Sequence, residues 1–202
     1  VEIIIEFEKG LGHNHPTFAI WTEDVNGTFL NSIFVTKSIA TGIFKYGPIG
    51  DMKWGKIPGV SQRSAALPYW GYKMSGGKYI LPTPQNPLPD AITGATPLSD
   101  FTLKTIAPDT NKFVILLEIN QTADWNEYWT NDKFPDNKNY MSSAQPSVIY
   151  AVTIDLKKPM KEYYLNPIGH GSFDGTGNEM FTDLSTITTA LSIVKKVKVL
   201  IK

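Results

Sequence analysis

Glycine and proline recur so often along this chain that they leave little room for long helices. The 202 residues include 16 Gly and 14 Pro. Proline breaks a helix interior and glycine weakens one. Between these breaks lie short runs that alternate apolar and polar residues, or that are rich in β-branched and aromatic residues, as strands are. About seven such runs are predicted strands: residues 2–8, 18–23, 28–36, 101–106, 113–119, 147–156 and 197–201.

Local signals predict two hairpins and one helix. Asn26-Gly27 lies between two predicted strands and is the strongest short signal for a tight type I′ turn. Residues 107–112 are predicted to join strands 101–106 and 113–119 in a second hairpin. Near the C-terminus the apolar spacing becomes helical behind Asp183, a residue suited to an N-cap. We therefore expect a short helix over residues 184–194.

The first and last strands carry opposite charges. Glu side chains alternate with apolar residues over residues 2–8, and Lys side chains do so over residues 196–202. Pairing these two strands places opposite charges across one solvent-exposed face. We therefore predict that the terminal strands are neighbours.

The predicted fold is a single domain over residues 1–202. It is all-β, an antiparallel β-sandwich that is immunoglobulin-like in the broad sense, with long loops and one short C-terminal helix. Residues 37–97 and 120–146 form loops rich in Trp and Tyr, and loops of this length are uncommon unless they serve a function. Their aromatic rings either cap the ends of the sandwich or bind a carbohydrate or protein ligand. Arg63 either clamps its loop internally or makes a bidentate contact with a ligand.

Composition argues against several functional classes. The 19 Lys and Arg residues balance 19 Asp and Glu residues. Because no basic cluster stands out, nucleic acid is not an expected partner. No apolar run approaches the roughly 20 residues of a transmembrane segment. The chain has no cysteine, which excludes disulfides and thiolate chemistry. It starts at Val1, so we expect that an upstream segment was removed.

The most specific motif is Asp90-Ala-Ile-Thr93-Gly94-Ala95-Thr96. It resembles the acceptor motif of covalently flavinylated proteins, Asp-x-x-(Ser/Thr)-Gly-Ala-Thr. The resemblance implies that Thr96 carries FMN through a phosphoester bond. It also implies that a separate enzyme, an FAD:protein FMN transferase, attaches the FMN.

The residue types fit this chemistry in part. The hydroxyl of Thr96 can attack the phosphoanhydride of FAD, and Gly94 and Ala95 leave the approach uncluttered. A bound flavin needs a flat partner, for which Trp70, Tyr69 and Trp54 are candidates. The alternative is a rigid turn whose hydroxyls bond their own backbone.

Five segments form a wider pattern: Leu67-Pro68-x-Trp70, residues 90–97, Asp124-Trp-Asn-Glu-Tyr128, Ala144-Gln-Pro-Ser-Val-Ile-Tyr150 and Gly169-His170. Together they resemble an uncharacterised family of predicted periplasmic proteins, a domain of unknown function. Members of that family sometimes occur beside flavin transferases and flavin-dependent membrane electron-transfer proteins. The resemblance implies an exported accessory or electron-carrier protein, with a flavin transferase and a membrane redox protein as partners.

The three histidines are a second candidate site. His13 and His15 are two residues apart, so on a strand both face the same way and could share one metal ion. His170, or a carboxylate near it, could complete the site. Gly12 and Pro16 argue against a regular strand there, and solvent-exposed or backbone-bonded imidazoles are the alternative.

Two functions from different classes therefore lead, and an enzyme ranks third. The first is an extracytoplasmic accessory or electron carrier with covalent FMN on Thr96. The second is an extracytoplasmic binding module, either for a metal through the histidines or for a carbohydrate or protein through the aromatic loops.

Overall fold

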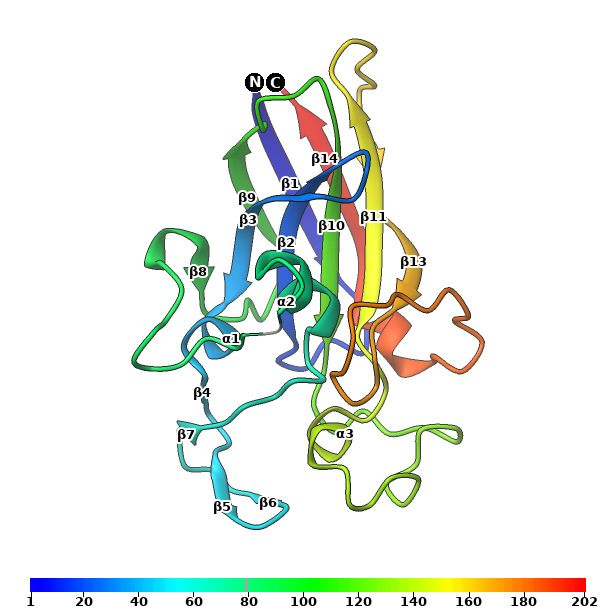
Figure 1. Cartoon of the computed structure of the whole chain (residues 1–202). Coiled ribbons are helices and arrows are strands. Elements are labelled where there is room, and N and C mark those ends of the chain that lie inside the picture. The colour runs from blue at the N-terminus through cyan, green and yellow to red at the C-terminus, as the bar shows by residue number, and fades with distance from the viewer. Residues whose placement is uncertain (79) are drawn as a thin grey trace.

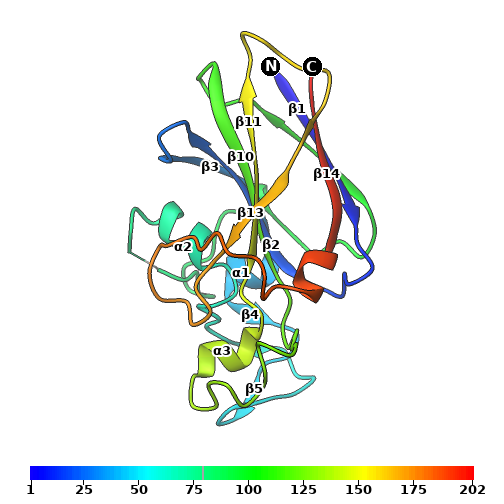
Figure 2. The ribbon, with the colours of Figure 1, turned by 90° about the vertical axis from the view of Figure 1, so that its right-hand side faces the viewer.

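The computed structural model describes residues 1–78 and 80–202 and is built mainly of strands (Figure 1). Tyr79, one of the loop aromatics, lies outside the described residues. A four-stranded sheet has the order β12-β14-β1-β9, and a six-stranded sheet has the order β13-β11-β10-β2-β3-β8 (Figures 1 and 2). Every pairing in these sheets is antiparallel except that of β3 with β8.

The strands of the two sheets have the following bounds: β1 Glu2–Lys9, β2 Thr17–Asp24, β3 Phe29–Thr36, β8 Thr93–Gly94, β9 Phe101–Ile106, β10 Lys112–Asn120, β11 Val148–Asp155, β12 Tyr163–Tyr164, β13 Asn166–His170 and β14 Val194–Ile201. Two small sheets pair β4 (Ile43–Phe44) with β7 (Gly59–Val60) and β5 (Pro48–Gly50) with β6 (Lys53–Trp54). The helical segments are α1 Lys37–Thr41, α2 Pro68–Met74, η1 Asp90–Ile92, α3 Lys138–Ser143 and η2 Thr189–Ser192.

One apolar cluster joins the two sheets. The alternation of β1 buries Ile3, Ile5 and Phe7, which pack with side chains from β2, β10 and β14. Burial of each such side chain contributes roughly 1.5–3 kcal/mol. The alternating residues of the six-stranded sheet point the other way into a second cluster, which includes Trp21 and Leu116 and is covered by α1 and α2. This explains why residues 113–119 are apolar on both faces.

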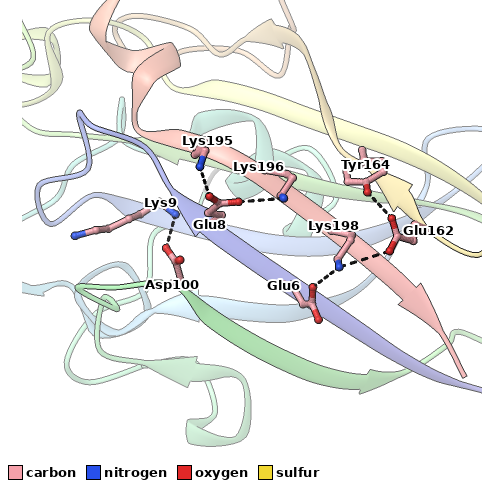
Figure 3. A network of polar contacts seen from close by, with 9 residues as sticks. All are labelled: Glu6, Glu8, Lys9, Asp100, Glu162, Tyr164, Lys195, Lys196 and Lys198. Atoms are coloured by element: carbon pink, nitrogen blue, oxygen red, sulfur yellow. Dashed lines mark hydrogen bonds and ion pairs between the residues drawn. The ribbon is translucent and has the colours of Figure 1, made fainter.

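The terminal strands are neighbours, which confirms that prediction. β1 pairs antiparallel with β14, and the register places Glu6 opposite Lys198 and Glu8 opposite Lys196. Figure 3 shows the resulting ion pairs, with 2.8 Å between Lys198 Nζ and Glu6 Oε2 and 3.1 Å between Lys196 Nζ and Glu8 Oε2. The opposite charges of the two ends of the sequence therefore lie across one exposed face.

The hairpin at Asn26-Gly27 is confirmed, because β2 and β3 pair antiparallel. Its turn is not the expected type I′ turn, since Gly27 has a φ of +82° and Asn26 is not in the positive region. The Asp24 carboxylate instead accepts hydrogen bonds from the backbone N–H groups of Asn26 and Thr28, at 2.8 Å each. An Asp side chain thus sets this turn.

The second predicted hairpin is wrong. β9 pairs with β1 in the four-stranded sheet, whereas β10 pairs with β2 and β11 in the six-stranded sheet. β9 alternates between half-buried and exposed residues, as suits an edge strand, while β10 is buried on both faces. Residues 107–111 therefore carry the chain from one sheet to the other.

The predicted C-terminal helix is also wrong. Residues 184–194 contain one turn of 3₁₀ helix, η2, and Val194 already begins β14. The Asp183 carboxylate accepts a hydrogen bond from Ser185 N at 2.9 Å, which closes a local turn instead of capping a helix. Threonines of this segment bond to other loops: Thr186 Oγ1 accepts from Trp129 Nε1, and Thr188 N donates to Gln145 Oε1. These tertiary bonds outweigh the helical spacing of the apolar residues.

Candidate functional site

The flavinylation-like motif lies at one edge of the six-stranded sheet. Asp90 opens η1, and Thr93 and Gly94 form β8 beside β3. The chain then leaves the sheet through Ala95 and Thr96 toward β9. Asp90 and Ala95 are exposed, whereas Thr93, Gly94 and Thr96 are half-buried. The motif is therefore a surface segment with one anchored strand.

The loop after the motif is bonded to the turn that follows β1. Thr96 Oγ1 donates to Pro16 O at 3.1 Å, and His13 Nε2 lies 2.9 Å from Pro97 O. Lys9 Nζ donates to Leu98 O at 3.2 Å. The structure thus brings Thr96 and His13, two separately predicted site residues, into one pair of contacting loops.

Gly94 has no room for a larger side chain, because it packs closely against a neighbouring aromatic ring of the same chain. A Cβ at this position would come within 2.7 Å of the Phe34 ring. Phe34 stacks on Phe18 at 5.1 Å between ring centroids, and Phe18 in turn stacks on Phe7 at 5.8 Å. Phe7 contacts the His13 ring edge-on, also at 5.8 Å. A row of aromatic rings therefore lies beneath both loops.

Trp70 does not present a ring face for a flavin. It is fully buried in the cluster beneath α2, and its indole Nε1 donates to Ser32 Oγ at 3.1 Å. Tyr69 packs beside Trp21 at 6.2 Å between ring centroids. Trp54 lies on β6 within a separate segment, residues 43–60. Proximity in sequence to Thr96 is thus a poor guide here, because α2 turns its aromatic residues into the core.

The three histidines occupy different settings. His13 and His15 lie in a turn and not on a strand, and His15 has a φ of +56°, so the two-residue spacing does not align their side chains. His170 is buried on β13, where Nδ1 lies 2.8 Å from Gly171 O and the ring stacks on Phe181. Within residues 1–78 and 80–202, no group of three or more His, Cys, Asp or Glu side chains is placed to hold a metal ion.

The aromatic residues of the 120–146 loop pack mainly inward. Tyr140 and Trp129 are buried in the main cluster, where they contact Phe173. Tyr128 is half exposed, and the ammonium of Lys133 lies 3.2 Å from the centre of its ring. Most of these rings therefore cap one end of the sheets. This is the first of the two roles that the sequence analysis gave to the aromatic residues of these loops.

Two segments of the wider sequence pattern are bonded to each other. Gln145 Nε2 donates to Asp124 O at 2.9 Å, and Thr189 Oγ1 donates to the Asp124 carboxylate. Ala123 and Ala144, the residues beside them, both have positive φ. Burial raises the pKa of Asp124 above its usual range. This network fixes the 120–146 loop against η2.

Sequence reasoning missed Glu118, which is the most buried carboxylate described. It is fully buried on β10 and accepts hydrogen bonds from Trp70 N at 2.7 Å, Tyr69 N at 3.2 Å and Ser147 Oγ at 2.5 Å. Burial raises its pKa to about 7. The available signal was a single charged residue in the apolar run 113–119. Its partners show that it anchors the start of α2 to the sheet.

Comparison with protein-family models, curated proteins and solved structures finds no match for the chain. None of the helices in the described part of the chain has the length and apolar character needed to cross a membrane.

Proposed function

We propose that the chain is an extracytoplasmic, periplasmic β-sandwich protein, immunoglobulin-like in the broad sense, that carries FMN covalently on Thr96. It would serve as an electron carrier or redox accessory. A separate FAD:protein FMN transferase would attach the flavin, and a membrane redox protein would exchange electrons with it. The observation that carries the proposal is the position of Thr96 in a surface loop, where its hydroxyl bonds a single backbone carbonyl.

Flavinylation would transfer the FMN half of FAD to the Thr96 hydroxyl. Thr96 Oγ1 attacks the phosphorus of the FMN half of FAD and forms the phosphoester bond. The phosphoanhydride bond breaks, AMP leaves, and the hydroxyl proton passes to a base of the transferase. The ester oxygen can no longer donate to Pro16 O, so flavinylation removes one bond between the two loops.

The residues of this chain fit a phosphate better than they fit a flavin ring. Lys9 and His13 bond the carbonyl groups of Leu98 and Pro97, so two basic side chains lie along the loop that follows Thr96. A charge-assisted hydrogen bond from the Lys9 ammonium stabilises a phosphate. Because Trp70 is buried, the isoalloxazine ring would have to lie on the surface of the loops. Bound flavin would supply one- and two-electron transfer.

The test is co-expression with an FAD:protein FMN transferase whose activity is verified on a known acceptor. We expect the intact mass of the protein to rise by one FMN less one water, with flavin absorbance and with the modification mapped to the peptide that holds Thr96. Thr96→Val removes the nucleophile and keeps the shape, so it abolishes the mass increase.

Ser99→Ala is the matched control, because Ser99 is an exposed hydroxyl in the same loop. This variant is expected to be modified like the unaltered chain. An unshifted mass of the unaltered chain, or a mass increase that survives in Thr96→Val, rejects the proposal.

A further inference from the structure

Residues 43–60 form an arm that extends beyond the two main sheets. The arm consists of the small sheets β4/β7 and β5/β6, and it lies at the end of the molecule opposite the two termini (Figure 1). Figure 2, turned by a quarter, shows β5 again at that end. The arm therefore lies beyond the two main sheets, at the same end of the molecule as α3 and its flanking loops.

Large apolar side chains on this arm face the solvent. Ile49 is 57% exposed and Ile57 is 67% exposed. Ile43, Tyr46 and Val60 are also exposed. Single exposed apolar residues are ordinary on protein surfaces, but five of them within 18 residues concentrate apolar surface on one projection.

The same arm carries a local surplus of positive charge. Lys45, Lys53 and Lys56 are exposed, and Asp51 is the acidic residue among residues 43–60. The whole chain has a formal net charge of zero. The arm therefore has a positive formal net charge, and the remaining residues together have a negative one.

Specific contacts hold the arm in shape. Gly47 N donates to Ile57 O at 2.8 Å, and a Cβ at Gly47 would come within 2.7 Å of the Gly59 backbone. At its base, Arg63 Nη2 donates to Tyr46 O at 2.9 Å and the guanidinium lies 4.0 Å from the centre of the Phe44 ring. Arg63 thus holds its own loop through internal contacts, which is one of the two roles that the sequence analysis gave it. These contacts fix the shape of the arm.

We propose that this arm binds the surface of an anionic lipid bilayer. Ile49 and Ile57, with the neighbouring Trp54, would enter the boundary between headgroups and acyl chains, and the lysines would bond to lipid phosphates. An apolar tip flanked by cations is the combination that holds peripheral proteins at such surfaces. Lysine stems can lie along the apolar boundary while their ammonium groups reach the phosphates.

The charge composition favours a lipid over a protein partner. Interfaces between proteins are enriched in Arg and depleted in Lys, whereas all exposed cations of this arm are lysines. The ammonium group interacts as a compact point charge and needs no bidentate partner. This proposal does not depend on flavinylation, because Thr96 lies in a different segment.

Co-sedimentation with vesicles tests the proposal. The unaltered chain is expected to sediment with phosphatidylcholine vesicles that contain phosphatidylglycerol, and to remain in the supernatant with phosphatidylcholine alone. At about 1 kcal/mol per lysine, replacing Lys45, Lys53 and Lys56 together by Gln weakens the binding by roughly a hundredfold. The double variant Ile49→Asp with Ile57→Asp is expected to weaken it by at least about tenfold.

The matched control replaces the three exposed lysines of the β11–β12 loop, Lys157, Lys158 and Lys161, by Gln. This change removes the same charge from another part of the surface and is expected to change the binding by less than about threefold, since distant charges are screened. Urea unfolding of each variant checks that its fold is retained. If the unaltered chain stays in the supernatant with anionic vesicles, as it would if the arm bound a protein instead, the proposal is overturned. Equal losses in the two lysine variants overturn it as well.

Discussion

The two main sheets use glutamate on their outer faces in opposite ways. On the four-stranded sheet, Glu6 and Glu8 are partly exposed to solvent and pair with lysines of the neighbouring strand. On the six-stranded sheet, Glu118 is fully buried beneath α2 and has hydrogen-bond donors as its partners. The same residue type thus helps to pair two strands in one sheet and fastens a helix to the other.

The two settings shift the pKa in opposite directions. Hydrogen bonds from Lys195 and Lys196 lower the pKa of Glu8, whereas burial raises the pKa of Glu118 to about 7. Water screens the exposed pairs, so each contributes little to stability. A buried carboxylate is costly to leave unpaired, and its partners are costly to leave without it. We therefore expect the stability of the fold to depend far more on Glu118 than on the exposed glutamates.

The largest effect is expected from Glu118→Ala. This change leaves Tyr69 N, Trp70 N and Ser147 Oγ without an acceptor inside the protein. At pH 6 we expect the free energy of unfolding to fall by about 3 kcal/mol or more, measured by urea denaturation. Glu118→Gln keeps an acceptor oxygen and is expected to lose much less at this pH. Equal stability of Glu118→Ala and the unaltered chain contradicts the role of Glu118 as an anchor.

The second largest effect is a contribution of Glu118 to the free energy of unfolding that decreases as the pH rises. A carboxyl group whose pKa is lowered by folding has the opposite effect. Because the folded pKa of Glu118 is about 7 and the unfolded value is 4.5, the folded state binds the proton more tightly. The stabilisation from this proton is complete below pH 4.5 and is lost as the pH rises through 7.

Urea denaturation of the unaltered chain and Glu118→Gln across this range measures the effect. The stability of Glu118→Gln is expected to rise relative to the unaltered chain by on the order of 3 kcal/mol between pH 4.5 and pH 8. The lowered pKa of Glu8 acts the other way, with stability lost as the pH falls below 4.5, and both proteins share that contribution. Parallel stability curves for the two proteins would show that Glu118 is not the titrating group.

Signals within one segment predicted the strands well. Alternation located β1 and β14, and their opposite charges identified them as neighbours. The failure at β9 and β10 has a physical cause, since a short connection between two strands fits a hairpin and a crossing between sheets equally well. A lone Glu118 in an apolar run indicates that the carboxylate has a buried hydrogen-bond partner. It does not indicate which residue that is, because the donors come from α2 and from Ser147, far from Glu118 in the sequence.

The sequence marks individual candidate residues, but it does not predict which of them the fold brings together. The motif located Thr96, and the contact of its loop with His13 and Pro16 joins residues about 80 positions apart. No local spacing encodes such a contact. The burial of Trp70 was hidden for a similar reason: α2 is short, with Pro68 in its first turn, and it depends on a tertiary bond to Glu118 for its position.

The smallest expected effect concerns the exposed charges. Glu8→Lys places a third ammonium group beside Lys195 and Lys196, which replaces attraction by repulsion. Because these groups lie in water, we expect the urea midpoint to fall by less than about 0.5 M at low salt, and by less still at 1 M salt. Adding Lys196→Glu restores an opposite pair across the same strands and is expected to recover most of the loss. A loss as large as that of Glu118→Ala, or one that salt does not reduce, would mean that the exposed charges stabilise the pairing of β1 with β14 as strongly as Glu118 stabilises the attachment of α2, and the contrast between the two sheets would fail.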